Sequence, residues 1–279
     1  MGSSNSGELR VLPFNRAAGA YQLAATEAVI DAVGLGLSPP TLRMYSWSRD
    51  SVILGVGQPA AQLDLEACRE LGCEVLRRIS GGTAVFHDGH TVSFQLVLPT
   101  EHPFLSDDIH VNYRRIAEIV IAMLASFGVE SRWASLEEAR ADHAPEGLEA
   151  LCFSSRAPFE VVTDGRKLVG LAQVRRRAVT ALQGMLYLRS RPLFSAQLVT
   201  RDPSERLRLA QILEARTTDL NSAASAQIDA EEVARRFRQA VEHVLREPAI
   251  ESPLTSYEEE RASELERTRY GNTEWTFRH

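Results

Sequence analysis

A cysteine and a lysine with the chemistry for acyl transfer stand fifteen positions apart in this sequence (167 − 152). Cys152 lies in the run Leu-Cys-Phe-Ser-Ser, and Lys167 follows an Asp-Gly pair that is a strong hairpin signal. A cation held near a thiol favours its thiolate, the form that attacks a carbonyl. Taken alone, the thiol could equally be a small buried apolar group, and the lysine a solvated hairpin residue. The hairpin that follows the cysteine presents the lysine, and this favours the pair as a catalytic candidate.

A second candidate site lies within residues 76–99, where a basic pair and a glycine turn separate two strand-like apolar runs. Gly81 and Gly82 can adopt positive φ and let backbone N–H groups approach a ligand. Arg77 and Arg78 add two permanent charges beside the turn. These residues favour an anionic or strongly polar ligand, although a Gly-Gly pair after a strand is also usual in a hairpin without any ligand.

Three segments, in this order, resemble the lipoate–protein ligase and octanoyltransferase family. Residues 42–47, Leu-Arg-Met-Tyr-Ser-Trp, and the following Leu-Gly-Val-Gly-Gln at 54–58 resemble its first pair of strands. Residues 77–88 read Arg-Arg-x-Ser-Gly-Gly-x-x-Val-Phe-His-Asp and resemble its signature. Residues 165–173, Gly-Arg-Lys-Leu-Val-Gly-Leu-Ala-Gln, resemble its lysine loop. Three matching blocks in the right order indicate more than coincidence.

The cysteine segment, Cys-Phe-x-Ser before a strand and Gly-Arg-Lys, resembles that of the cysteine-dependent octanoyltransferases in the family. The resemblance implies that Cys152 is the acyl-thioester nucleophile, and that Lys167 favours its thiolate and steadies the carbonyl oxygen. It implies a substrate site without metal, formed by Arg77, Arg78, Ser80, Gly81, Gly82, Thr83, His87, Gly170, Ala172 and Gln173.

The implied reaction takes an octanoyl group from octanoyl-acyl carrier protein to a lysine of a lipoyl domain or of the glycine-cleavage H protein, and it requires no cofactor. A related subgroup of the family, which takes the octanoyl group from the glycine-cleavage H protein, has a shorter interval between its cysteine and lysine. The fifteen-residue interval here (167 − 152) therefore resembles the carrier-protein-dependent type. The sequence after the histidine, at 86–91, is closer to the ligases, which use ATP and lipoate. An ATP-dependent ligase is therefore the first alternative, and a non-catalytic lipoyl or acyl binder in an assembly complex is the second.

The acyl chain and the reacting carbonyl need further groups. We expect Val85, Leu54 and Leu168 to form walls for the octanoyl chain, because burying each CH₂ is worth about 0.8 kcal/mol. Backbone N–H groups at 81–83 and the Lys167 ammonium are expected to stabilise the oxyanion. His87 is not expected to bind metal, since no third ligand is evident. The resemblance implies that it lies on the ligand-facing strand and binds or orients the acyl carbonyl.

Composition indicates an ordinary globular protein: 279 residues, 44% of them apolar and 24% charged, with a net charge of −6. That charge argues against nucleic acid as a partner, although Arg175, Arg176 and Arg177 form a local basic run that is either a solvated strand edge or a surface for acidic carrier and lipoyl domains. No apolar run is long enough to span a membrane, and no leader pattern is visible, so a cytoplasmic location is expected. Cys68 and Cys73 are predicted to be buried packing residues, free of disulfides.

Apolar periodicity predicts an α+β fold, a mixed β-sheet flanked by helices. Strands are predicted over 42–47, 51–55, 74–79, 92–98, 159–163, 167–172 and 178–188. Helices are predicted over 20–35, 63–71, 111–127, 205–215 and 230–245, with flexible connections at 135–148 and 217–228. The resemblance implies a lipoate ligase/biotin ligase-like catalytic domain over 8–250, with a helical C-terminal region. Residues 251–279 are expected to form a tail docked by Tyr270, Trp275 and Phe277.

Overall fold

Two β-sheets of different size organise the chain in the computed structural model, which describes residues 8–279. The larger sheet contains, in spatial order, β12 (Ala249–Glu251), β1 (Leu9–Val11), β3 (Thr41–Trp47), β7 (Thr91–Pro99), β11 (Val179–Tyr187), β10 (Arg166–Arg176), β9 (Val161–Thr163) and β8 (Arg132–Trp133), with β2 (Asn15–Ala17) paired to β3. The smaller sheet has the order β5 (Glu74–Arg77), β4 (Ser51–Leu54), β6 (Val85–His87). Parallel and antiparallel pairs occur in both sheets, so both are mixed.

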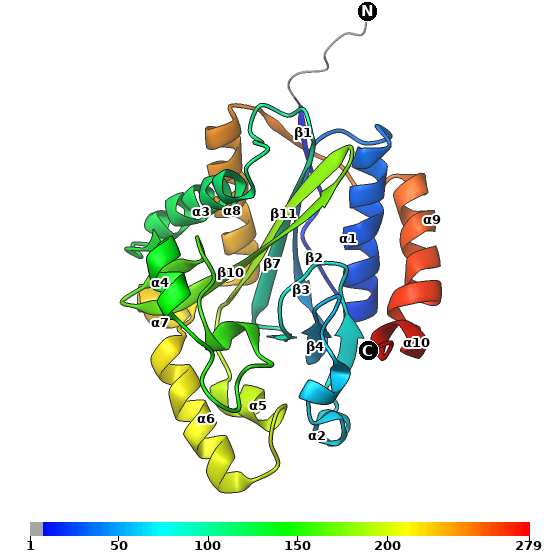
Figure 1. The fold of residues 1–279 in the computed structure, drawn as a ribbon. Helices are drawn as coiled ribbons and strands as arrows, with labels where there is room; N and C mark the ends of the chain where they lie inside the picture. Colours follow the sequence, from blue (N-terminus) through cyan, green and yellow to red (C-terminus); the bar gives the residue numbers. More distant parts are fainter. Residues whose placement is uncertain (1–7) are drawn as a thin grey trace, which may run out of the picture.

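Helices cover both faces of the larger sheet (Figure 1), as the sequence predicted. The α-helices are α1 (Gly19–Gly34), α2 (Leu65–Glu70), α3 (Ile109–Ser126), α4 (Leu136–Ala141), α5 (Pro192–Gln197), α6 (Pro203–Arg216), α7 (Leu220–Ala224), α8 (Ala230–Leu245), α9 (Ser256–Leu265) and α10 (Thr273–Thr276). Short helical turns are η1 (Ala60–Gln62), η2 (Cys152–Ser154) and η3 (Glu266–Tyr270). Helices α3 and α8 lie on one face, whereas α1 lies on the other and is itself covered by α9. In the described part of the chain, no helix is both long and apolar enough to cross a membrane.

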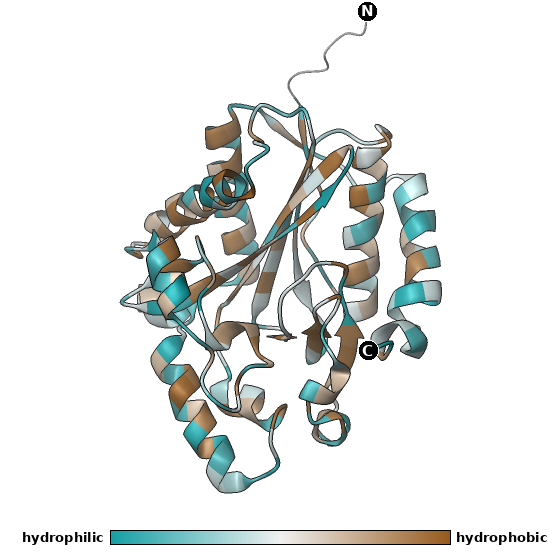
Figure 2. Cartoon of the chain, viewed as in Figure 1, coloured by the Kyte–Doolittle hydropathy of each residue, from teal (hydrophilic) through white to brown (hydrophobic). Residues whose placement is uncertain are grey.

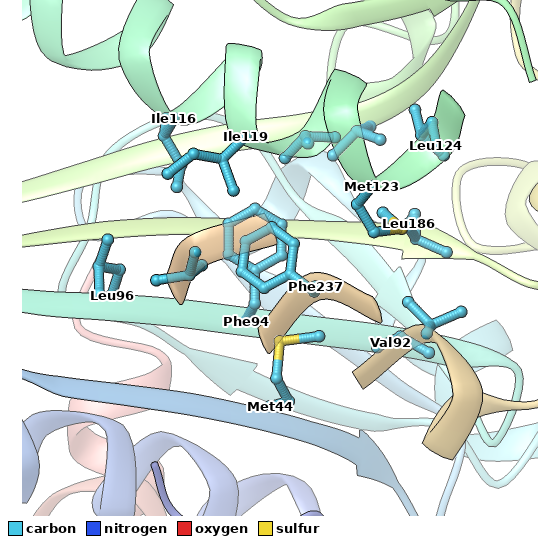
Figure 3. Close-up of a cluster of buried hydrophobic side chains, with 14 of the residues drawn as sticks. Met44, Val92, Phe94, Leu96, Ile116, Ile119, Met123, Leu124, Leu186 and Phe237 are labelled. Carbon is cyan, nitrogen blue, oxygen red and sulfur yellow. The ribbon is translucent and has the colours of Figure 1, made fainter. Parts of the chain in front are cut away.

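The main core lies between the larger sheet and helices α3 and α8 (Figure 3). Helix α3 carries Ile116, Ile119 and Met123 at helical spacing, so all three side chains face the sheet. On the sheet, Phe94 of β7 meets Phe237 of α8 with ring centroids 4.4 Å apart. Figure 2 shows both hydrophilic and hydrophobic residues along the peripheral helices α6 and α9. This mixture is typical of helices that pack one face against a core and expose the other to solvent.

Helices α4 and α7 lie within segments 135–148 and 217–228, so the prediction of flexible connections is wrong there. Each helix begins at a strong N-cap. Ser135 accepts a hydrogen bond from the Glu138 N–H in a capping box, and Asp219 accepts one from the Ser222 N–H. Helices of five or six residues show little apolar periodicity, so their caps were the available signal.

The C-terminal residues pack on α1 and on the smaller sheet. Tyr270 is 1% exposed, and the indole N–H of Trp275 donates to the carbonyl oxygen of Arg77 in β5 at 2.9 Å. Phe277 stays 44% exposed, so it does not dock as expected. At the other end of this region, the buried Arg10 of β1 donates to Glu258 of α9 at 2.8 Å. The segment is therefore fixed to the rest of the chain at both of its ends.

Candidate active site

Cys152 and Lys167 lie side by side in the structure. The Lys167 ammonium nitrogen is 3.7 Å from the Cys152 sulfur, and it donates to the carbonyl oxygens of Cys152 at 2.8 Å and of Ser155 at 3.1 Å. The lysine side chain is 1% exposed, which excludes a solvated hairpin lysine. The pair has the geometry of a thiol held beside a buried cation, as the sequence predicted.

Two local structures bring this pair together. The hairpin between β9 and β10 turns at Asp164 and Gly165, whose φ angles of 47° and 73° fit a tight two-residue turn. The cysteine segment is attached to the residue that follows the glycine loop. The Ala84 N–H donates to the Ala150 carbonyl at 2.9 Å, and the Cys152 N–H donates to the Ala84 carbonyl at 2.8 Å. These bonds hold the thiol beside residues 80–83.

A buried carboxylate, Glu160, completes the pair, although it was not among the predicted site residues. Its Oε2 atom lies 2.7 Å from the Lys167 ammonium, and the glutamate side chain is 2% exposed. Burial disfavours the ammonium, but the Cys152 sulfur and the Glu160 carboxylate favour it more, so the pKa of Lys167 lies above its ordinary value. A lone glutamate forms no motif; the available signal was that a buried lysine needs a counter-ion.

A cavity of about 370 Å³ lies between the two sheets and reaches Cys152. Predicted site residues that line it are Arg78, Ser80, Gly81, Gly82, His87, Cys152, Gly170, Ala172 and Gln173. Part of the cavity exists because two of the residues that line it are glycines. A Cβ on Gly184 would lie 2.4 Å from the Phe94 ring. A Cβ on Gly170 would likewise lie 3.1 Å from the Phe153 ring. Larger residues at these two positions would fill or distort the space.

The lining of this cavity corrects the prediction of which residues surround the octanoyl chain. Val85 lines it, as predicted. Leu54 and Leu168 are fully buried in two other apolar clusters and do not line it, because their strand positions point into those clusters. The apolar wall instead contains residues that were not predicted, among them Leu23, Tyr45, Trp47, Ile53, Phe94, Met185 and Tyr270.

The two arginines of the basic pair have different roles. Arg78 donates to the Ser80 hydroxyl at 3.0 Å and to the carbonyls of Gly81 at 2.6 Å and Thr83 at 3.0 Å, and so it braces the glycine loop. Gly82 in this loop has φ of +88°, which favours glycine. Thr83 does not line the cavity, and its carbonyl oxygen accepts a hydrogen bond from Arg78 instead.

Arg77 points away from the cavity, which corrects the expectation that it contacts the substrate. Neighbouring residues of a strand face opposite sides, so only one of the pair can face the ligand. The Arg77 guanidinium donates to the carbonyls of Gly55 at 2.7 Å, Gln58 at 2.6 Å and Thr276 at 2.9 Å. It therefore joins the smaller sheet to the C-terminal segment.

His87 faces the cavity and stacks on Trp47, with ring centroids 4.2 Å apart. Burial, followed by the charge of Arg78, lowers the pKa of His87 to about 3, so the imidazole is neutral at pH 7. Within residues 8–279 its buried Nδ1 atom has no hydrogen-bond partner, which leaves it free for a ligand. In the same residues, no group of three or more His, Cys, Asp and Glu side chains could hold a metal ion.

The other predicted surface and thiol residues fall outside this site. Arg176 is paired with Glu27 of α1 at 2.8 Å and also with Asp31, so the basic run is partly neutralised. Cys68 and Cys73 are buried as predicted. Burial raises the pKa of Cys68 to about 11 and raises that of Cys73 further, so neither thiol is activated.

Comparison with known proteins defines the class to which this fold and site belong. Residues 18–242 match the lipoyl protein ligase A/B catalytic domain family, and the chain belongs to that family. Among curated proteins, it is similar to octanoyltransferases named LipM. The LipM of Kyrpidia tusciae is 32% identical over 274 residues, covering 96% of this chain and 98% of that protein. The LipM of Moorella thermoacetica is 32% identical over 258 residues, covering 91% and 92%.

Solved structures agree on the fold. A bi-partite lipoate protein ligase from Thermoplasma acidophilum, described with its E2 lipoyl domain, gives a TM-score of 0.79 at 22% identity, covering 97% of this chain and 96% of that one. A lipoate-protein ligase A bound with ATP also gives 0.79 at 22% identity, covering 97% and 98%. The predicted lipoate ligase-like fold is therefore confirmed.

Proposed function

We propose that this chain is an octanoyltransferase of lipoate assembly and works through a thioester on Cys152. The observation that carries the proposal is the Lys167 ammonium, 3.7 Å from the Cys152 sulfur at a largely apolar cavity. The LipM relatives, similar over nearly the full chain, support octanoyl transfer. The enzyme is an acyltransferase, and no ATP is consumed.

In the first step, the Cys152 thiolate attacks the thioester carbonyl of octanoyl-acyl carrier protein. A carbon–sulfur bond to Cys152 forms, the bond to the carrier's thiol breaks, and the departing thiolate takes up the proton that Cys152 had lost. The oxyanion that forms in between accepts hydrogen bonds from backbone N–H groups at 81–83, and the positive charge of the Lys167 ammonium stabilises it electrostatically. Loss of one such donor costs roughly 2.7–4 kcal/mol in a well-studied acyl-transfer enzyme.

In the second step, a lysine amine of a lipoyl domain or of the glycine-cleavage H protein attacks the acyl-enzyme. An amide bond forms, the bond between the acyl carbon and Cys152 breaks, and the amine's surplus proton is released as the thiolate returns. The ammonium again faces the oxyanion. His87 is neutral, and its free Nδ1 atom orients the acyl group in both steps.

The octanoyl chain occupies the cavity between the sheets. Its volume of about 370 Å³ lies within the usual range of roughly 300–1,000 Å³ for small-molecule sites. Val85, Trp47 and Ile53 supply apolar wall, and each CH₂ that leaves water adds about 0.8 kcal/mol. We assign the reaction to the cytoplasm, because free thiols persist in reducing compartments.

Intact mass spectrometry tests this proposal. The wild-type chain incubated with octanoyl-acyl carrier protein, without ATP, should gain one octanoyl group. Cys152→Ala should gain none, whereas Cys68→Ala, a matched control at a buried thiol, should still be acylated. An adduct on Cys152→Ala would contradict the assignment.

Two alternatives give different products in the same assay. A lipoate–protein ligase would form an acyl-adenylate only with ATP and free lipoate, and Cys152→Ala would not affect it. A non-catalytic binder would give neither product. The ligase remains the second candidate, because residues 86–91 resemble the ligases.

A further inference from the structure

We propose that Glu160 is a positioning residue, which holds the Lys167 ammonium beside the Cys152 sulfur and keeps it charged in both steps. The inference rests on the proposed function, because it concerns the same pair. It starts from a geometric observation. The carboxylate of Glu160 and the ammonium of Lys167 are 2.7 Å apart, and both side chains are almost completely buried.

The hydrogen bonds of Lys167 require the protonated form. Three oxygen atoms surround its nitrogen: Oε2 of Glu160 at 2.7 Å, the Cys152 carbonyl at 2.8 Å and the Ser155 carbonyl at 3.1 Å. An ammonium has three N–H donors, one for each oxygen. A neutral amine would have two donors and would turn a lone pair towards an acceptor. Of the three oxygens, that of Glu160 carries the negative charge.

The position of Glu160 is itself fixed by the backbone. Its Oε2 atom accepts from the Ala157 N–H at 2.7 Å, and its Oε1 atom accepts from the Leu171 N–H at 3.4 Å. The preceding Phe159 has φ of 68°, an uncommon angle for a bulky residue, and its ring packs against Trp133. The chain therefore enters Glu160 along a constrained path that turns the carboxylate towards Lys167.

The carboxylate must also affect the cysteine. A negative charge disfavours a second anion nearby, so Glu160 alone would oppose the Cys152 thiolate. Arg78, which interacts electrostatically with Cys152, balances this effect, because its hydrogen-bond partners in the described residues are all neutral. With Cys152 as thiolate, the charges of Glu160, Lys167, Arg78 and Cys152 sum to zero. With the thiol, they sum to +1.

Other titratable or charged groups near the pair are Tyr113 of α3 and Tyr187 of β11, together with Asp142, Arg156 and Arg216, which line a second pocket with Lys167. Burial opposes ionisation of Asp142, but its pairing with Arg156 and Arg216 outweighs burial and lowers its pKa, so these three groups stay charged over the working range. Burial raises the pKa of Tyr113 and raises that of Tyr187 well above its ordinary value, so both stay neutral over the working range. The pH response of the cysteine should therefore be controlled by Glu160, Lys167 and Arg78. Removing the negative charge of Glu160 makes both the Cys152 thiol and the Lys167 ammonium easier to deprotonate.

The pH dependence of thiol alkylation tests this inference. Iodoacetamide is reacted with the free, full-length enzyme, and the rate at Cys152 is followed by peptide mass spectrometry. In Glu160→Gln, the alkylation rate should rise at lower pH than in the wild type, because the negative charge that opposes the Cys152 thiolate is gone, and octanoyl transfer at pH 9 should fall at least tenfold, because Lys167 loses its counter-ion. Glu137→Gln, an exposed acid on α4, should leave the profile unchanged.

The charge-conserving variant Glu160→Asp distinguishes charge from packing and serves if Glu160→Gln does not fold. Its profile should stay close to wild type, while kcat falls because the shorter side chain reaches Lys167 less well. An alkylation profile in Glu160→Gln that matches the wild type, or the same shift in both variants, would overturn the inference. Alkylation needs no acyl donor, so a wild-type chain that takes up no octanoyl group would refute the proposed function without deciding the role of Glu160.

Discussion

Gly55 and Gly82 are in backbone contact: a Cβ built on Gly55 would lie 1.8 Å from the Gly82 carbonyl oxygen. The loop at 80–83 therefore rests directly on the end of β4. The Val56 N–H strengthens this contact, because it donates to the Ser80 carbonyl at 2.9 Å. The position of the glycine loop, and of the Cys152 segment attached to Ala84, depends on the absence of a side chain at residue 55.

Gly55→Ala should displace the glycine loop. The added methyl group cannot fit against a backbone carbonyl, so we expect overpacking to cost about 1–3 kcal/mol of unfolding free energy and transfer to fall at least tenfold. Gly57→Ala is the matched control, because a Cβ there meets nothing within 4 Å. Denaturant midpoints and initial transfer rates are the measurements. Equal behaviour of the two variants would mean that this contact does not position the site.

His87 should make the protein sensitive to acid. Burial and Arg78 lower its pKa from the ordinary value of 6.5 to about 3, so the unfolded chain binds this proton more readily between those values. Stability is then fully present above pH 6.5 and declines as the pH falls towards 3, by about 1.4 kcal/mol per unit. Urea unfolding over this range should show a shallower slope in His87→Gln. The exposed His90→Gln is the control, and a slope unchanged in His87→Gln would refute the assignment.

The sequence was most informative where long periodic segments or a paired turn signal were present. Helix α8 was predicted at its observed bounds, and the Asp164-Gly165 turn correctly placed Lys167 on the hairpin. Resemblance, rather than periodicity, identified Cys152 as its partner. Strands such as β1 and β8, with two or three residues, are too short to show alternation, so they were missed.

Long-range contacts explain the remaining misses. Glu160 meets Lys167 through tertiary packing, and no spacing rule announces such an ion pair. Arg77 and Arg78 are adjacent, yet only the structure shows which one faces the cavity. Tyr270 lines the cavity although it belongs to residues 251–279, which the sequence analysis treated as a tail outside the catalytic domain.

Tyr270 should limit the length of the acyl chain. Its ring lines the cavity from beyond the family match at 18–242, and its hydroxyl donates to Glu27 at 2.8 Å. Tyr270→Ala removes a ring that lines the cavity and leaves room for a longer acyl chain, so the ratio of dodecanoyl to octanoyl transfer should rise several-fold. Tyr270→Phe keeps the ring and should leave that ratio unchanged, with a stability loss of about 1.5–3 kcal/mol for the hydrogen bond to the charged carboxylate. Competition between the two carrier-bound donors measures the ratio, and an unaltered ratio in Tyr270→Ala would exclude this role.

Arg10 and Glu258 should fix the C-terminal segment to the larger sheet. The two side chains are 6% and 0% exposed, and Glu258 also accepts from the Ser38 hydroxyl at 2.9 Å. Burial opposes ionisation, but the hydrogen bonds of Arg10 and the others outweigh it and lower the pKa of Glu258, so this contribution is present above about pH 4.5 and is lost as the pH falls further.

Removing one member of this pair leaves a buried charge without a partner. Glu258→Gln should therefore cost about 3–5 kcal/mol of unfolding free energy, whereas the double variant Arg10→Met with Glu258→Leu should recover most of the loss, because apolar pairs replace buried ion pairs well. Denaturant unfolding gives the free energies, and hydrogen exchange at 256–279 shows whether the loss begins in α9. The exposed Glu260→Gln is the control on the same helix. If the double variant were no more stable than Glu258→Gln, an unpaired charge would not be the cause of the loss.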